Sequence, residues 1–186
     1  YGAVPTIASG SVMLIGTPGT TQIDPTSAGA PAVQVDGAAS QPKAELTIQG
    51  VTLIGATGAT GHGIYCTKAL SAPAPSVTVV ESVIRDNGGA GVFGSNCDVT
   101  VRRTKVHNNS AGGLWLSQGQ YTITNCLITK NDGIGGVLLA TPQPAGSTSF
   151  EHNTVYDNDS AGTYSGVECS GGNSTLTNSN VSGNDK

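Results

Sequence analysis

Apolar and polar positions repeat at a fixed spacing along the second half of the chain. Between residues 98 and 131, Val101 and Ile123 occupy equivalent places, and so do Val106 and Ile128. An Asn follows the second apolar residue of each copy by three positions, and the template recurs on both sides, with its Asn residues at Asn87, Asn109, Asn131, Asn158 and Asn184. Their spacings of 22, 22, 27 and 26 residues are typical of solenoid repeats.

Each repeat predicts three short strands. Upstream, the apolar runs SVMLIG, TQID and PAVQV are separated by Gly, Pro or Ser clusters, and ELTIQG, VTLIG and HGIYC repeat this triplet. From residue 76 each repeat reads strand, corner, strand, Asn, Gly-rich turn and strand. Such clusters interrupt strands and form turns, and apolar residues at helical spacing are absent. The pattern therefore predicts an all-β protein.

Burial explains how such strands make a fold. Each strand is too short to form a core alone, but coiling places equivalent residues about 4.8 Å apart on neighbouring coils. Two inward columns are expected, Ile48, Val79, Val101, Ile123, Phe150 and Leu176, and Leu53, Ile84, Val106, Ile128, Val155 and Val181. We therefore expect a single-stranded parallel β-helix with about three strands per coil and 22–27 residues per coil in its regular part.

The 22-residue period, the V-x-x-x-x-[VI]-x-x-N-x-x-x-G-[VLI] pattern and the turn Asn resemble the right-handed parallel β-helix proteins of the pectate-lyase-like superfamily. The resemblance covers roughly residues 11–186 and implies that the five Asn residues stack as an internal ladder of amide hydrogen bonds. Asn also tolerates the left-handed backbone of a sharp corner. The resemblance does not specify a function, because one fold hosts many activities.

Composition agrees with a folded, single-domain solenoid. Of the 186 residues, 37% are apolar, 11% are charged and the net charge is only −4, whereas disordered chains combine low hydrophobicity with high net charge. We expect one β-helix domain over residues 1–186, and interpret it as a fragment of a longer chain because it starts within the pattern. No run of 18 apolar residues exists, so no membrane span is expected.

The four cysteines lack the CxxC spacing of zinc sites, and no His stands at metal-ligand spacing from them. No metal or other cofactor is therefore expected. Calcium, which enzymes of the pectate-lyase-like superfamily usually bind, is possible by resemblance but is not indicated by these residues. Cys66 and Cys97 lie close in the expected register, so they form either a disulfide or two free thiols. A disulfide implies an extracellular or cell-surface protein. Cys126 and Cys169 occupy inward columns and are expected to be buried.

Basic residues are concentrated at one place in an otherwise acidic chain. Superfamily enzymes that cleave acidic polysaccharides use Arg and Lys, usually with Asp-bound calcium, so the resemblance makes four residues catalytic candidates: Arg85, Arg102, Lys105 and His107. The column neighbours of Arg102 are Val80 and Thr124 rather than carboxylates, so the lyase motif is not matched. The alternative is a solvated face on which ion pairs form locally.

A third feature is the outward column of the third strand. Tyr65, Phe93 and Trp115 fall there on successive coils, followed by Leu138 and Glu168. Exposed apolar patches commonly mark interaction sites, so this stripe is a candidate ligand-binding platform for sugar rings or a partner surface. Alternatively, an N-terminal strand or the insertion at residues 141–147 covers it.

These observations predict an exported or cell-surface module that is not an enzyme and presents a regular face to a polysaccharide or a surface protein. One alternative is a polysaccharide-active enzyme, a lyase or a glycoside hydrolase. Another is a structural solenoid that self-associates end to end or laterally through its open edges. The acidic balance and the lack of recognition motifs argue against nucleic acid as a partner.

Overall fold

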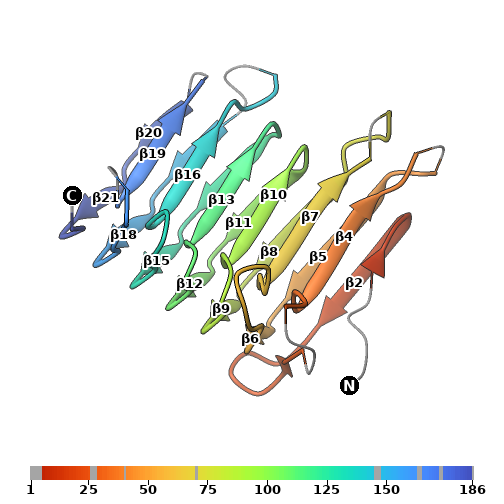
Figure 1. Cartoon of the computed structure of the whole chain (residues 1–186), viewed down its shortest axis with the longest axis horizontal. Coiled ribbons are helices and arrows are strands. Elements are labelled where there is room, and N and C mark those ends of the chain that lie inside the picture. Colours follow the sequence, from red (N-terminus) through yellow and green to blue (C-terminus); the bar gives the residue numbers. More distant parts are fainter. Residues whose placement is uncertain are drawn as a thin grey trace.

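The computed structural model of the chain describes residues 6–25, 29–39, 41–69, 71–144, 148–162, 165–171 and 174–185, and every regular element in them is a β-strand. Successive strands coil through three sheets, and all pairings between named strands are parallel. Figure 1 shows the coils following one another along the longest axis, from the N-terminal end to the C-terminal end. The prediction of a parallel β-helix with three strands per coil is confirmed.

The three sheets each contain one strand from every coil. Sheet A consists of β1 (Thr6–Ile7), β4 (Val33–Gly37), β7 (Ile64–Lys68), β10 (Val92–Ser95), β13 (Leu114–Ser117), β16 (Val137–Ala140) and β19 (Val167–Ser170). Sheet B consists of β2 (Gly10–Ile15), β5 (Ala44–Gln49), β8 (Ser76–Val80), β11 (Asp98–Arg102), β14 (Tyr121–Thr124), β17 (Thr148–Glu151) and β20 (Ser174–Thr177). Sheet C consists of β3 (Gln22–Ile23), β6 (Thr52–Ile54), β9 (Val83–Arg85), β12 (Lys105–His107), β15 (Leu127–Thr129), β18 (Thr154–Tyr156) and β21 (Asn180–Ser182).

The core consists of the inward columns that the repeat predicts. Val79, Val101 and Ile123 stack in register in sheet B, and Ile84, Val106 and Ile128 stack in sheet C. These side chains are fully buried. The last members, Leu176 and Val181, are 40% and 44% exposed because the edge strands β20 and β21 are covered on one side only.

The asparagine ladder is also confirmed. Each ladder Nδ2 donates to the Oδ1 of the next ladder residue, at 2.9 Å from Asn87 to Asn109, 2.9 Å from Asn109 to Asn131, 3.0 Å from Asn131 to Asn158 and 2.9 Å from Asn158 to Asn184. The expectation that ladder residues themselves take the left-handed conformation is wrong. That conformation belongs to the residue before each of the four rungs from Asn87 to Asn158, namely Asp86, Asn108, Lys130 and Asp157.

A second internal polar column, which was not predicted from the sequence, lies at the corner between sheets B and C. Its members are small or polar residues that precede each ladder Asn by five positions: Ser82, Thr104, Cys126, Asn153 and Ser179. Side chains of this column accept backbone N–H groups of the preceding coil, for example Cys126 N to Asn153 Oδ1 at 2.9 Å. The column satisfies corner donors that burial would otherwise leave unpaired.

The cysteines have three different environments. A disulfide joins Cys66 to Cys97, and both residues are fully buried. Cys126 is buried as expected, and burial raises the pKa of its thiol to about 11. The expectation that Cys169 is buried is wrong. Its column position is inward, beside Leu139, but β19 is the edge strand of sheet A and leaves it exposed.

Candidate functional site

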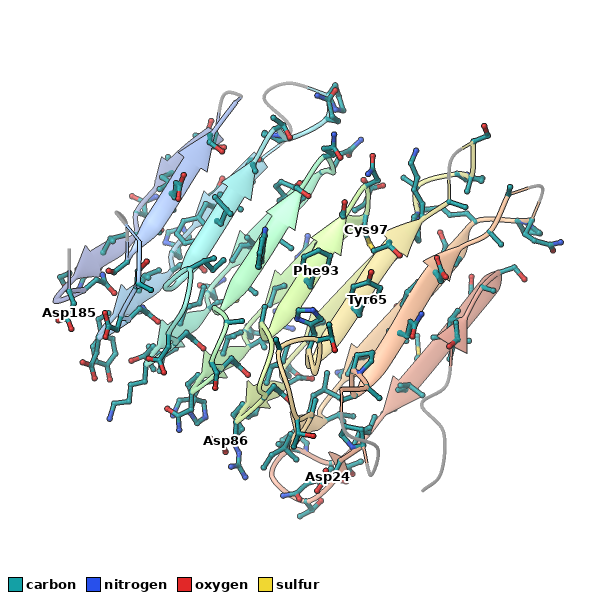
Figure 2. All side chains as sticks on the ribbon, in the orientation of Figure 1. Asp24, Tyr65, Asp86, Phe93, Cys97 and Asp185 are labelled. Carbon is teal, nitrogen blue, oxygen red and sulfur yellow. A yellow bond between two sulfur atoms is a disulfide. The ribbon has the colours of Figure 1, made fainter. Side chains whose placement is uncertain are left out.

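The outer face of sheet A carries an apolar column across four neighbouring coils. Tyr65 on β7, Phe93 on β10, Trp115 on β13 and Leu138 on β16 are direct neighbours in the strand register. All four side chains are half-buried. Figure 2 shows Tyr65 and Phe93 on neighbouring strands. We call Tyr65, Phe93, Trp115 and Leu138 the apolar strip.

The rings of the strip pack against one another. Tyr65 and Phe93 are nearly parallel, with centroids 5.2 Å apart and an interplanar angle of 9°. This arrangement is an offset stack, which aromatic pairs prefer to a face-to-face sandwich. Trp115 is turned by 68° relative to Phe93 at 5.4 Å. The strip is therefore an ordered aromatic cluster rather than a row of independent side chains.

His62, which was not predicted from the sequence, completes this cluster. Its ring stacks on Phe93 at 5.0 Å and on Tyr65 at 5.6 Å. The Ala90 N–H donates to His62 Nδ1 at 2.9 Å, so this nitrogen is an acceptor and the proton of the neutral ring is on Nε2. Burial lowers the pKa of His62, which favours that neutral form. The ring, which accepts the Ala90 hydrogen bond, packs against both Tyr65 and Phe93.

Beside the strip runs a column of hydroxyl side chains, which was also missed. Thr67, Ser95 and Ser117 lie two positions after the three aromatic residues and are half-buried like them. Ser95 and Ser117 are direct register neighbours. We call Thr67, Ser95 and Ser117 the hydroxyl column. Its sequence signal is the recurring pattern of an aromatic residue, one residue of any type and then Ser or Thr.

The outward positions of sheet A contain few charges. Asp36 on β4 flanks Thr67, so it ends the hydroxyl column, and Glu168 on β19 flanks Leu138, so it ends the apolar strip on the opposite side. Lys68 ends β7, one position beyond the hydroxyl column. Among the described strand residues of sheet A, no Arg is present.

The basic candidates do not converge on one site. Arg102 lies on β11 in sheet B, between Val80 and Thr124 as expected. Lys105 and His107 lie on β12 in sheet C, where His107 is next to Arg85 on β9. The structure therefore places Arg102 on a different sheet from the other three candidates.

Arg85 and His107 belong to a local polar network on sheet C. Arg85 pairs with Asp86, and Asn108 Nδ2 donates to Asp86 Oδ1 at 3.1 Å. Burial opposes ionisation of Asp86, but these hydrogen bonds and the charge of Arg85 outweigh it and lower its pKa. Burial, and after it the charge of Lys105, lowers the pKa of His107. These contacts constitute a surface ion-pair network at a corner of the coil.

A similar ion pair holds a neighbouring corner. Arg103 Nε donates to Glu81 Oε1 at 2.9 Å, one coil away, and both side chains are largely exposed. Exposed pairs of this kind contribute little stability.

The described ranges lack two further features, a metal-binding group and a membrane-spanning helix. No group of three or more His, Cys, Asp or Glu residues that could hold a metal ion occurs there. Nor does that part of the chain contain a helix able to cross a membrane.

The family model described as a right-handed beta helix region matches residues 31–186. No curated protein and no solved structure shows a significant match to the chain. The match covers all the coils that carry the ladder, the apolar strip and the basic candidates. The observed sheets and ladder agree with it, and the chain belongs to the right-handed β-helix family.

Proposed function

We propose that this protein is an exported or cell-surface β-helix module that is not an enzyme and that binds a polysaccharide or a partner protein through the outer face of sheet A. The observation that carries the proposal is the apolar strip, ordered by His62 and bordered by hydroxyl groups. The apolar surface of these partly exposed rings is unfavourable in contact with water, and a ligand that covers it removes this unfavourable free energy.

The disulfide supports the proposed location outside the cytosol. Cys66 and Cys97 are joined and fully buried. Disulfides form and persist in oxidising compartments such as the extracellular space.

The enzyme alternative draws on Arg85, Arg102, Lys105 and His107. Arg102 lies on a different sheet from the others, and Arg85 is occupied by Asp86. Polysaccharide cleavage needs groups that converge on one bond. The placement of these residues therefore favours binding over catalysis.

The test uses a glycan array together with an array of purified extracellular proteins, probed with the intact chain. We expect binding that is lost in Trp115→Ala, with no new reducing ends or unsaturated products. Product formation that disappears in Arg102→Ala would instead establish the enzyme. Absence of binding on both arrays would contradict the proposed function, and light scattering would then show whether the chain assembles with itself.

A further inference from the structure

We propose that the outer face of sheet A binds a neutral polysaccharide in an extended conformation, with the sugar chain running along the solenoid axis from β7 to β16. This inference rests on the proposed function and names the polymer that the face accepts. Three features of the face support it: the direction of the apolar strip, the pairing of aromatic rings with hydroxyl groups, and the charges on sheet A.

The direction follows from the strand register. Tyr65, Phe93, Trp115 and Leu138 are neighbours across strands, so the apolar strip runs along the axis rather than along any one strand. Successive positions are separated by about 4.8 Å, so the strip is roughly 14 Å long. A ligand that contacts the whole strip must therefore be extended and must offer an apolar surface at several successive points.

The paired columns favour a sugar polymer over a protein surface. On three successive coils, an aromatic ring stands beside a hydroxyl group: Tyr65 with Thr67, Phe93 with Ser95, and Trp115 with Ser117. Each sugar unit of an extended polysaccharide likewise offers an apolar C–H face beside a rim of hydroxyl groups. Both partners repeat the same two chemistries, whereas the surface of a globular protein without repeats has no such period.

The hydroxyl column retains capacity for hydrogen bonds to a ligand. Thr67 Oγ1 donates to Asp36 Oδ1 at 3.4 Å, Asn96 Nδ2 donates to Ser95 Oγ at 3.4 Å, and Ser117 Oγ donates to Gly94 O at 3.5 Å. These distances are longer than strong hydrogen bonds. A hydroxyl group has one donor and two acceptor sites, so each can exchange or add a partner when a sugar binds.

The charges select a neutral polymer. The strands of sheet A carry two acidic residues at outward positions, Asp36 and Glu168, and one cation, Lys68, at the end of β7. Asp36 stands at one end of the hydroxyl column, and Glu168 stands at the opposite end of the apolar strip, so a polyanion on this face would meet like charges, which disfavours binding. The exposed cations that would attract a polyanion, Arg102 and Lys105, lie on sheets B and C instead.

The aromatic cluster is preorganised. His62 is only 6% exposed and stacks on Tyr65 and Phe93, and the Ala90 N–H holds its ring. Side chains that are already fixed lose little conformational entropy when a ligand binds. The cluster therefore does not need to rearrange to contact a sugar chain.

The test uses the fluorescence of Trp115, which is the only tryptophan in the chain. Intact protein is titrated with a soluble neutral β-glucan or xyloglucan, and separately with polygalacturonate or alginate. We expect the neutral polymers to shift Trp115 emission in a saturable way and the acidic polymers not to. Because few charges take part, raising the salt to about 0.5 M should change the affinity by less than about two-fold.

Affinity gel electrophoresis of variants locates the site without relying on fluorescence. Trp115→Ala and Phe93→Ala should each weaken binding by about ten-fold or more. Tyr156→Ala is the matched control because Tyr156 is an aromatic side chain, 40% exposed, on sheet C. It should leave the affinity unchanged, as should Arg102→Ala combined with Lys105→Ala. Circular dichroism checks that each variant is folded.

Each other outcome overturns the inference in a distinguishable way. Retardation by acidic polymers alone, lost on removal of Arg102 and Lys105, would move the site to sheets B and C. Binding to proteins alone would show that the face binds a partner protein. A dimer that Trp115→Ala dissociates would show that the face binds a second copy of this chain. Binding to proteins alone would leave the proposed function standing, because that function includes a partner protein on this face. A site on sheets B and C, self-association alone or the absence of any binding would overturn the proposed function as well.

Discussion

Asn109 shows how a single side chain connects three coils. Its Nδ2 donates to Asn131 Oδ1 at 2.9 Å and to Ile84 O at 3.3 Å. Its Oδ1 accepts from Asn87 Nδ2 at 2.9 Å. The residue is fully buried, so water cannot replace these partners.

We predict that Asn109→Leu lowers the free energy of unfolding by about 3 kcal/mol or more, because buried polar groups left without partners cost about 1–3 kcal/mol each. Thr122→Ser, at a half-buried outward position of sheet B, should change it by less than about 0.5 kcal/mol. Thermal or denaturant melts measure both variants. Equal effects would contradict a stabilising role for the ladder.

At the level of the structural elements, neighbouring coils approach one another closely where the strands of sheet A begin. A Gly precedes the first residue of these strands in five coils, at Gly63, Gly91, Gly113, Gly136 and Gly166. A Cβ at Gly91 would lie 2.7 Å from the backbone oxygen of Gly113 and 2.7 Å from Val106 Cγ1. Both neighbours belong to the next coil and the buried core, so neither can move freely.

We predict that Gly91→Ala destabilises the protein by roughly 2 kcal/mol or more, since overpacking typically costs 1–3 kcal/mol. Gly162→Ala is the control, because among the described residues its added Cβ would approach only the Ser160 hydroxyl oxygen, at 3.3 Å. That variant should remain within about 0.5 kcal/mol of the parent in a denaturant melt. A harmless Gly91→Ala would show that neighbouring coils can separate at this point.

For the whole molecule, the disulfide adds a covalent link between two neighbouring coils, whose strands β7 and β10 also pair directly. Cys66 and Cys97 are 31 residues apart and close a loop that contains β8, β9 and β10. The bond limits the conformations of the unfolded chain, which stabilises the folded state.

We predict that Cys66→Ala combined with Cys97→Ala lowers the free energy of unfolding by about 3.5 kcal/mol, from the loop-closure entropy of the disulfide. Cys169→Ala should have little effect because this thiol is exposed and free. Mass spectrometry after thiol labelling provides a check on the cysteines themselves. The native protein should label at Cys169 only, while Cys126 should label after unfolding.

Much of the architecture follows from the sequence by itself. Residues equivalent to Val101, Val106 and Asn109 recur every 22–27 residues, a spacing typical of stacked coils. In a solenoid, each coil packs against neighbouring coils with the same pattern. A local pattern therefore specifies the sheets, the inward columns and the ladder. The outward position of Tyr65, Phe93 and Trp115 also follows, from the alternation of side chains along a strand.

Only the tertiary structure decided which residues act together. His62 occupies a column otherwise held by Ala90, Gly112, Gly135 and Ser165, so no repeating pattern points to its stack on Tyr65 and Phe93. Arg102 and Lys105 are three positions apart, yet a corner places them on different sheets. Cys169 has an inward position and is still exposed. Periodicity determines which way a side chain points, whereas its contacts depend on where the chain turns and on what covers it.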